Sequence, residues 1–564
     1  MNKLMGDYNK TIFWVSFAII AAIIIWGITS VDTFSAVVNW CMANLTDYFG
    51  WWLILLVATV TLLFLWIICS KYGGLKLGLP SDKPEYSGFS WFAMLFSCGI
   101  GVGFLFWGIA EPMTHFMSES PYITDGLGTA QHYSDAMNVA MFHWGIHGWI
   151  GYMALGLPLA YFAYRIRVPM SPSYTWYGLV GNRVKGPIGT IINIVSIFAT
   201  VLGVSTTVGM GIMQTSYAIP LLFGIEPTTA VLAVFTLLII ISFTASSISG
   251  LNRGIKHLSR INIYLAIFFM VFMFCVGPSK HIINLILETS GLYATKFIYM
   301  TFYTNVAGDY SGWINGWTVF YWAWWLSWGP FTGGFVARIS KGRSIRQLLV
   351  GSLLLPTAFT LVWFCTLGGT AMYDQVNGIA DIASVLSQNL GAGVYALLEV
   401  VPLTGFFNWF VTINLFIFIV TTADSASFLV AMMSTNGKRT PKMVMRLIWG
   451  FGIGSISLLL LISGGLSAVQ TSSVVAALPL SIVTAGAVIS MMRVINKYEF
   501  KTTDPDNPPP YVLYPEIKES AMLFDPDLTE EDFAYDPSWR EHLKDETKNR
   551  EKKDKNEAVT VIKS

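Results

Sequence analysis

The chain has 564 residues, of which 54% are hydrophobic and only 12% are charged, and its formal net charge is +1. This balance is typical of a multi-spanning membrane protein and gives no basis for nucleic-acid binding. The five cysteines are odd in number, so they indicate no disulfide framework. The sequence shows neither a nucleophile–base pair nor a complete set of metal ligands, and we therefore do not expect an enzyme.

Runs of roughly 20 apolar residues mark candidate membrane spans. Twelve such runs lie at 11–29, 50–69, 89–110, 137–164, 187–217, 229–250, 260–278, 313–337, 347–371, 401–433, 443–465 and 470–495. The first follows Lys3 and Lys10, as the apolar part of a signal peptide does. However, it is long enough to span a membrane and no A-x-A-like cleavage site follows it, so we expect a retained helix. The predicted fold class is an all-α membrane protein with twelve transmembrane helices.

Lysine and arginine residues alternate between the loops and so predict the orientation. Positive clusters follow the even-numbered spans, at 71–83, 165–185, 253–256, 338–346 and 438–446. The intervening loops contain almost none, the exceptions being Lys280 and Lys296. Because positively charged loops stay on the cytoplasmic side, both termini are predicted to be cytoplasmic.

Two segments fall outside the spans. Residues 279–303 carry apolar positions at helical spacing together with Lys, His and Glu, which predicts a helix along the outer membrane surface. Seventeen of the 33 acidic residues follow Met492, in a tail that we expect to be mostly disordered and cytoplasmic. The predicted organisation is a cytoplasmic N-terminus (1–10), two accessory helices (11–88), two blocks of five spans (89–278 and 313–495) separated by an interfacial segment (279–312), and the tail (496–564).

The third span contains the motif Gly99-Ile-Gly101-Val-Gly103. Alternating glycines weaken a membrane helix and expose its backbone, which is tolerated only against protein or a cavity. The motif is not a nucleotide-binding loop, since no soluble βαβ unit surrounds it. Close packing between helices explains the glycines about as well as a binding role does.

The eighth span contains five tryptophans within residues 316–331. They run through its middle, whereas membrane tryptophans usually collect at the two interfaces. Trp324, Trp325 and Trp328 are spaced to cover one broad side of a helix, which Gly329–Pro330 is predicted to break. Interrupted helices at the start of both five-span blocks indicate a transporter site, where exposed N–H groups bind a carboxylate and freed carbonyl oxygens hold a sodium ion.

The fourth span adds Trp144, Trp149 and Tyr152, whose spacing lets them line one flank of a cavity. Clustered aromatic faces attract a quaternary ammonium, by about 0.5–2 kcal/mol per contact. Packing between helices is the alternative for any single ring. His143 and His147 have no third ligand nearby, so we expect them to form hydrogen bonds rather than to hold a metal.

The tenth span carries five oxygen-bearing side chains within residues 421–427. Hydroxyl groups in membrane helices usually bond back to the carbonyl four residues earlier, which is the alternative explanation for each. Five oxygen-bearing side chains in seven residues are more than such back-bonding requires, and adjacent hydroxyl groups are suitable ligands for a small hard cation. Asp424 is a functional candidate as an ionisable residue within the membrane, although we expect it to anchor helices rather than to bind the ion.

Four motifs together resemble the betaine/choline/carnitine transporter family, from near residue 10 to residue 495. They are the glycine motif (99–103), the aromatic stretch (144–152), the tryptophan stretch (320–325) running into 337–343, and the hydroxyl stretch (421–425). The tryptophan stretch is the most specific. The resemblance implies a LeuT-type inverted repeat of spans three to seven and eight to twelve with two helices added in front, a homotrimer embedded in membrane lipid, and alternating access without a cofactor.

The resemblance also implies functional residues. Trp144, Trp149, Tyr152 and Trp325 would form an aromatic box for trimethylammonium, beside Gly99, Gly101 and Gly103. Trp322, Trp324 and Trp328 would line the neighbouring pathway. Sodium, the coupling ion, would be held by Thr421 and Thr422 with backbone oxygens of Ser97, Ile100 and Phe418, and a second sodium ion by Thr200 and Phe331.

Two positions distinguish members of the family. Choline carriers often have an aspartate where Gly103 stands, so glycine favours a zwitterion such as glycine betaine. Sodium-independent exchangers have an arginine at the position of Asn262, so the neutral residue favours sodium coupling. The expected function is sodium-coupled uptake of glycine betaine or a related quaternary ammonium for osmoprotection, in a bacterial inner membrane. A proton-coupled choline or carnitine carrier and a betaine-binding membrane osmosensor are the alternatives.

Overall fold

The computed structural model describes residues 8–78, 82–99, 101–249, 254–435 and 441–499. Most of these residues are helical, and within these ranges β-type pairing is limited to two isolated bridges, Lys76 with Ser344 and Ser120 with Ile123. In a lipid environment a helix satisfies its backbone hydrogen bonds within one segment. The prediction of an all-α membrane protein is confirmed at this level.

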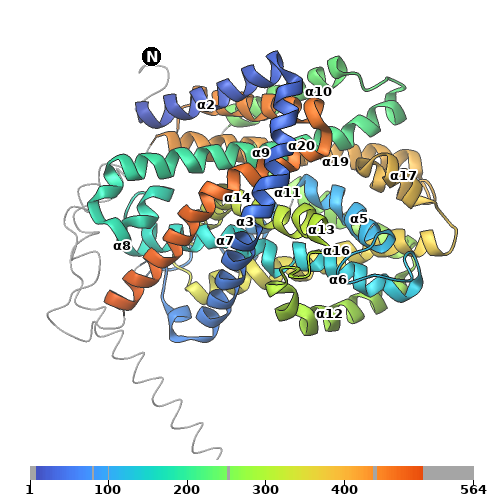
Figure 1. Cartoon of the computed structure of the whole chain (residues 1–564), viewed down its shortest axis with the longest axis horizontal. Helices are drawn as coiled ribbons and strands as arrows, with labels where there is room; N and C mark the ends of the chain where they lie inside the picture. Colours follow the sequence, from blue (N-terminus) through green and yellow to red (C-terminus); the bar gives the residue numbers. More distant parts are fainter. Residues whose placement is uncertain (1–7, 79–81, 100, 250–253, 436–440, 500–564) are drawn as a thin grey trace, which may run out of the picture.

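Seven helices of the described chain are long and apolar enough to cross a membrane. They are α2 (Lys10–Thr29), α3 (Val31–Cys69), α9 (Pro187–Phe223), α10 (Thr229–Ser249), α16 (Ile345–Val376), α19 (Thr404–Ser434) and α20 (Met443–Val494). Helices α9 and α20 pack against each other, and α3 crosses over α20 at the front of the view in Figure 1. The third, fourth and eighth predicted spans are each built from shorter helices.

Two of the long helices differ from the predicted intervals. Helix α3 has 39 residues, so the second predicted span, 50–69, is only its C-terminal part. Helix α20 combines the eleventh and twelfth predicted spans and turns at Gly464 and Gly465. Gly465 has a φ of 57°, a conformation that glycine adopts without steric cost. The turn divides α20 into two segments, each of which has the length of a span.

The third and fourth predicted spans are each divided. The third consists of α4 (Gly88–Gly99) and α5 (Val102–Met117), with Gly101 in an extended conformation between them. The predicted interruption at the glycine motif is therefore confirmed. The fourth consists of α6 (Tyr133–Trp144) and α7 (Ile146–Ala160), which separate at Gly145. That second break was not predicted.

The eighth span keeps its helical path through the Gly-Pro pair. Helix α14 (Phe320–Ser327) leads into a π-helical turn at Gly329–Gly333 and then into α15 (Gly334–Arg338). Pro330 has no N–H group, so the winding widens at this point instead of ending. The break predicted at Gly329–Pro330 is therefore wrong in form.

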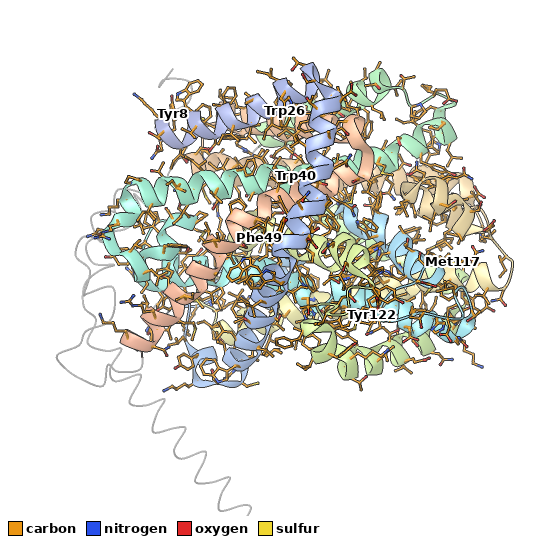
Figure 2. All side chains as sticks on the ribbon, in the orientation of Figure 1. Tyr8, Trp26, Trp40, Phe49, Met117 and Tyr122 are labelled. Carbon is orange, nitrogen blue, oxygen red and sulfur yellow. The ribbon has the colours of Figure 1, made fainter. Side chains whose placement is uncertain are left out.

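The outer boundary of the molecule is apolar. Trp26, Trp40 and Phe49 project from α2 and α3 and are exposed (Figure 2). Large exposed apolar surfaces of this kind indicate contact with a membrane.

Helix α11 (Gly254–Val276) is followed by α12 (Ser279–Phe302), and the axes of this pair are bent by 111°.

Candidate functional site

Four rings predicted to form an aromatic box lie together in the interior. Trp144 ends α6, Trp149 and Tyr152 lie on α7, and Trp325 lies on α14. The ring centroids of Trp144 and Trp325 are 4.8 Å apart, those of Tyr152 and Trp325 5.5 Å, and those of Trp149 and Tyr152 5.5 Å. Each pair meets nearly at right angles, which brings ring edges against ring faces. The side chains are 3–5% exposed.

The break at Gly145 positions two of these rings. It ends α6 directly after Trp144 and starts α7 three residues before Trp149. The end of a helix leaves carbonyl groups without partners, and Nε1 of Trp325 donates to the carbonyl of His143 at 3.0 Å. At the start of α7 the N–H of Ile146 donates to the hydroxyl of Tyr293 at 3.1 Å. The exposed backbone groups at the break are thus bonded by side chains from other helices.

The glycine motif of the third span packs directly against the box. A Cβ atom on Gly103 would lie 2.6 Å from Cη2 of Trp144, and one on Gly99 would collide with Cη2 of Trp149. A Cβ atom on Gly101 would lie 3.4 Å from Oγ1 of Thr422. At Gly99 and Gly103 only glycine allows the tryptophan rings to approach this closely, whereas at Gly101 an added methyl group would be in ordinary van der Waals contact. The backbone break lies between the aromatic rings and the hydroxyl stretch of α19.

The three tryptophans predicted to line the neighbouring pathway have different neighbours. Trp324 stacks on Trp325 with centroids 4.5 Å apart, and its Nε1 has no acceptor among the described residues. Trp328 stacks on Tyr152 at 5.9 Å and donates to the carbonyl of Gly203 on α9 at 2.9 Å. Trp322 instead contacts His147, at 5.3 Å, and Phe142. Its ring therefore packs against α6 and α7 away from the box.

The hydroxyl stretch of α19 divides into residues with different roles. Thr421 donates to the carbonyls of Ile417 at 2.9 Å and Phe418 at 3.1 Å. This is the bonding to the helix backbone that was the alternative to cation binding. Thr422 faces Gly101, as described above. Asp424 accepts from Ser246 of α10 at 2.8 Å and pairs with Arg446 of α20 at 2.6 Å. The carboxylate therefore links three helices, which agrees with the predicted anchoring role.

The other predicted sodium ligands are only partly placed. Ile100 lies outside the described residues, and Ser97 is described by its backbone in α4 alone. Thr200 on α9 is buried, and its hydroxyl has no hydrogen-bond partner within the described ranges. Phe331 lies in the π-helical turn, 5.3 Å from Trp328 by ring centroids, and this turn contacts α9. A sodium site at Thr200 and Phe331 stays a prediction.

Comparison with known proteins agrees with this geometry. The family model described as "BCCT, betaine/carnitine/choline family transporter" matches residues 11–500. The chain belongs to this transporter family.

Its relatives include proteins named as transporters of glycine betaine, choline or ectoine. The chain is 39% identical over 494 residues to the glycine betaine transporter OpuD of Bacillus subtilis (strain 168), covering 87% of this chain and 96% of the relative. It is 35% identical over 480 residues to the high-affinity choline transport protein of Escherichia coli (strain K12), covering 84% and 70%. It is 34% identical over 502 residues to the ectoine/hydroxyectoine transporter of Virgibacillus pantothenticus, covering 89% and 99%. The family predicted from the motifs is confirmed, and its members are membrane transporters rather than enzymes.

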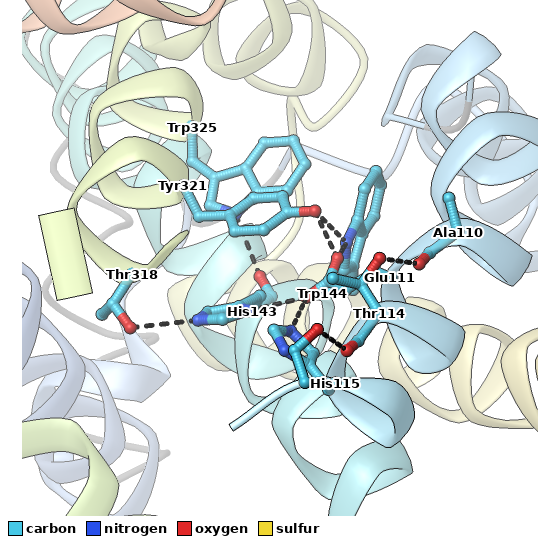
Figure 3. Close-up of polar contacts among 10 residues, drawn as sticks. Ala110, Glu111, Thr114, His115, His143, Trp144, Thr318, Tyr321 and Trp325 are labelled. Carbon is cyan, nitrogen blue, oxygen red and sulfur yellow. Dashed lines mark hydrogen bonds and ion pairs between the residues drawn. The ribbon is translucent and has the colours of Figure 1, made fainter. Parts of the chain in front are cut away.

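One charged residue of the transporter lies beside the box and was not predicted. Glu111 on α5 is fully buried, and its Oε2 accepts from Nε1 of Trp144 at 2.6 Å and from the hydroxyl of Tyr321 (Figure 3). Its Oε1 lies 2.7 Å from Nδ1 of His143 and 3.4 Å from Nε2 of His115. The predicted third span ended at residue 110, whereas α5 continues to Met117 and includes Glu111. A carboxylate bordering an apolar run was the signal that could have identified it.

The same cluster changes the interpretation of the histidines. The ligand atoms of Glu111, His115 and His143 lie within 4.8 Å of one another, a set of metal-binding residue types that was not recognised in the sequence. In the structure, however, one carboxylate oxygen already contacts both imidazoles, and Nε2 of His143 pairs with Thr318 at 3.1 Å. His147 bonds separately to Thr301 at 2.8 Å. Both histidines form hydrogen bonds as predicted, but the expectation that no third ligand lies nearby is wrong for His143, which has Glu111 and His115 beside it.

Proposed function

We propose that the protein is a sodium-coupled symporter for glycine betaine or a closely related quaternary ammonium osmolyte. The observation that carries this proposal is the box of Trp144, Trp149, Tyr152 and Trp325 beside the backbone break of the third span. A trimethylammonium group is weakly hydrated and cannot donate a hydrogen bond, so aromatic faces are its most favourable partners.

The carboxylate of a zwitterion has partners at the same place. Helix α5 begins at Val102, and the first N–H groups of a helix lie at the positive end of its dipole. The N–H of Phe104 already donates to the carbonyl of Gly101 at 3.1 Å, so the N–H groups of Val102 and Gly103 are the candidates for the carboxylate. Nε1 of Trp324, which has no acceptor in the described part of the chain, is a further donor next to the box. Gly103 contributes no negative side chain here. These features favour glycine betaine over choline, which has no carboxylate.

Sodium coupling is supported by the residues of α19 that face the backbone break of the third span. Gly101 faces the hydroxyl of Thr422, and carbonyl groups left free by an interrupted helix are suitable ligands for a hard cation. Asn262 is buried and neutral, so no fixed cation takes the place of the ion there. Sodium and substrate would each order the same backbone segment, so binding of one favours binding of the other.

The proposed architecture follows the family. We assign the twelve intervals above to twelve spans, with 89–278 and 313–495 as LeuT-type inverted repeats that alternate access to the two sides. The irregular windings of the third and eighth spans occupy the first span of each half. We further propose a homotrimer in a bacterial inner membrane, with both termini cytoplasmic.

Uptake by reconstituted protein tests the proposal. Proteoliposomes are supplied with radiolabelled betaine, choline or carnitine under an inward sodium gradient or an inward proton gradient. We expect betaine to accumulate with sodium and to stop accumulating when potassium replaces it. Accumulation of choline or carnitine with protons alone would instead support the alternative carrier. Deletion of residues 505–564 should leave uptake intact, whereas an osmosensor would accumulate no substrate with or without this segment.

A further inference from the structure

The buried carboxyl group of Glu111 is bonded directly to the aromatic box. Its Oε2 is bonded by Trp144, a member of the box, and by Tyr321 (Figure 3). The ring of Tyr321 stacks on Trp325 with centroids 5.5 Å apart and meets Trp144 at 5.7 Å. A single side chain of α5 therefore contacts, directly or through one residue, rings contributed by two different spans.

The donors around Glu111 match an ionised carboxylate. An indole nitrogen can only donate, and the hydroxyl of Tyr321, which accepts from Trp144 at 3.1 Å, donates its own proton to Oε2. At Oε1 the imidazoles of His143 and His115 present nitrogens that can each carry a proton. A carboxylate that accepts several hydrogen bonds is stabilised in its charged form, and such bonds are stronger than those between neutral groups.

We propose that Glu111 is a positioning and specificity residue for the cationic end of the substrate. It holds Trp144 and Tyr321 in place and, through its hydrogen bonds to them, makes the aromatic rings more attractive to the trimethylammonium group. This inference rests on the proposed function. A hydrogen bond from an indole to an anion polarises the ring, so its face attracts a cation more strongly. An ionisable group inside a membrane protein is also costly to retain without such a role.

A matched pair of ligands separates charge recognition from shape. Glycine betaine and 3,3-dimethylbutanoate have the same carboxylate and nearly the same shape, but the second has carbon in place of the quaternary nitrogen. We expect wild-type protein to prefer betaine strongly when both compete with radiolabelled betaine for binding to purified protein. In Glu111→Gln the affinity for betaine should fall at least tenfold, while the affinity for 3,3-dimethylbutanoate stays unchanged or rises.

The control makes the same chemical change at an exposed residue. Glu288 accepts from Ser134 at 2.8 Å on the surface of α12, and Glu288→Gln should keep the wild-type preference. If Glu111→Gln lowers the affinity for both ligands by the same factor, or changes neither affinity, the proposed role is overturned. Failure of wild-type protein to bind betaine would contradict the proposed function, which is a different result.

Two further variants keep the test decisive if Glu111→Gln does not reach the membrane. Glu111→Asp retains the charge on a shorter side chain, so it should retain the preference for betaine over 3,3-dimethylbutanoate. Trp144→Phe keeps a ring but removes the N–H that bonds to Oε2, so it should lower that preference. An unchanged preference in Trp144→Phe, or a preference lost in folded Glu111→Asp, would contradict the proposal.

Discussion

The rings of Trp144 and Trp325 meet with their centroids 4.8 Å apart and their planes at 75°. The two residues belong to different spans, and Trp325 also bonds to the carbonyl of His143, directly before Trp144. The α6–α7 break and the eighth span therefore define one site. Substitutions at the elements that surround this contact should affect transport in distinct ways.

Substituting Gly103 should disturb the box without removing any ring. In Gly103→Ala the new methyl group would lie 2.6 Å from Cη2 of Trp144, so the indole must move. Overpacking of this kind costs about 1–3 kcal/mol, and we expect the KM for betaine to rise or uptake to be lost while the protein remains in the membrane. In Gly291→Ala on α12 the added methyl group meets no described atom within 4 Å. Normal uptake by Gly103→Ala would show that the ring position is not critical.

The two threonines of α19 should contribute unequally to sodium binding. Thr422→Ala removes the hydroxyl that faces Gly101, and we expect the sodium concentration for half-maximal uptake to rise roughly tenfold, or about 1.4 kcal/mol. Thr421→Ala should lower the apparent sodium affinity less, because that hydroxyl already bonds to two carbonyls. The double variant should have the lowest apparent sodium affinity. Thr412→Ala, on the same helix but bonded to Asn408 and Tyr395, is the control. Identical sodium dependence in all four variants would disprove the assignment of Thr421 and Thr422.

Asp424→Asn should affect stability rather than ion binding. The change removes the charge that pairs with Arg446 at 2.6 Å, and breaking a buried ion pair costs about 3–5 kcal/mol. The purified variant should unfold at a lower temperature, while the folded fraction keeps its apparent sodium affinity. Asp381→Asn makes the same change at an exposed helix cap, which asparagine also fills well, and should leave both quantities unchanged. A lower sodium affinity at unchanged stability would make Asp424 a ligand instead.

The sequence predicts those features that depend on local chemistry. Long apolar runs predict the long helices, and alternating glycines predict the interruption between Gly99 and Val102, because both effects act within one segment. Helix α3 extends back to Val31 through polar residues such as Asn39 and Asn44, which lower the hydropathy but do not end a helix. Hydropathy therefore predicts the presence of a long helix better than the residue at which that helix begins.

The missing parts of the site depend on contacts between distant segments. The break at Gly145 is stabilised by Tyr293 and Trp325, which no local pattern around the glycine reveals. In the sequence Glu111 resembles the polar end of a span, and only the structure shows that Trp144 and Tyr321 lie beside it. Trp322 shares its spacing and residue type with its neighbours, but it packs against His147. Residue types identify candidates, and tertiary packing selects among them.

The most direct test of the aromatic box is the equilibrium binding of radiolabelled glycine betaine to purified Trp325→Ala. Loss of one cation–π contact costs about 0.5–2 kcal/mol, and Trp325 also supports Trp144 and Tyr152, so we predict at least a tenfold weaker affinity. Trp325→Phe should lose less because it keeps a ring, and Trp40→Ala, on the exposed face of α3, should bind as the wild type does. If Trp325→Ala binds betaine with wild-type affinity, the rings do not form the substrate site.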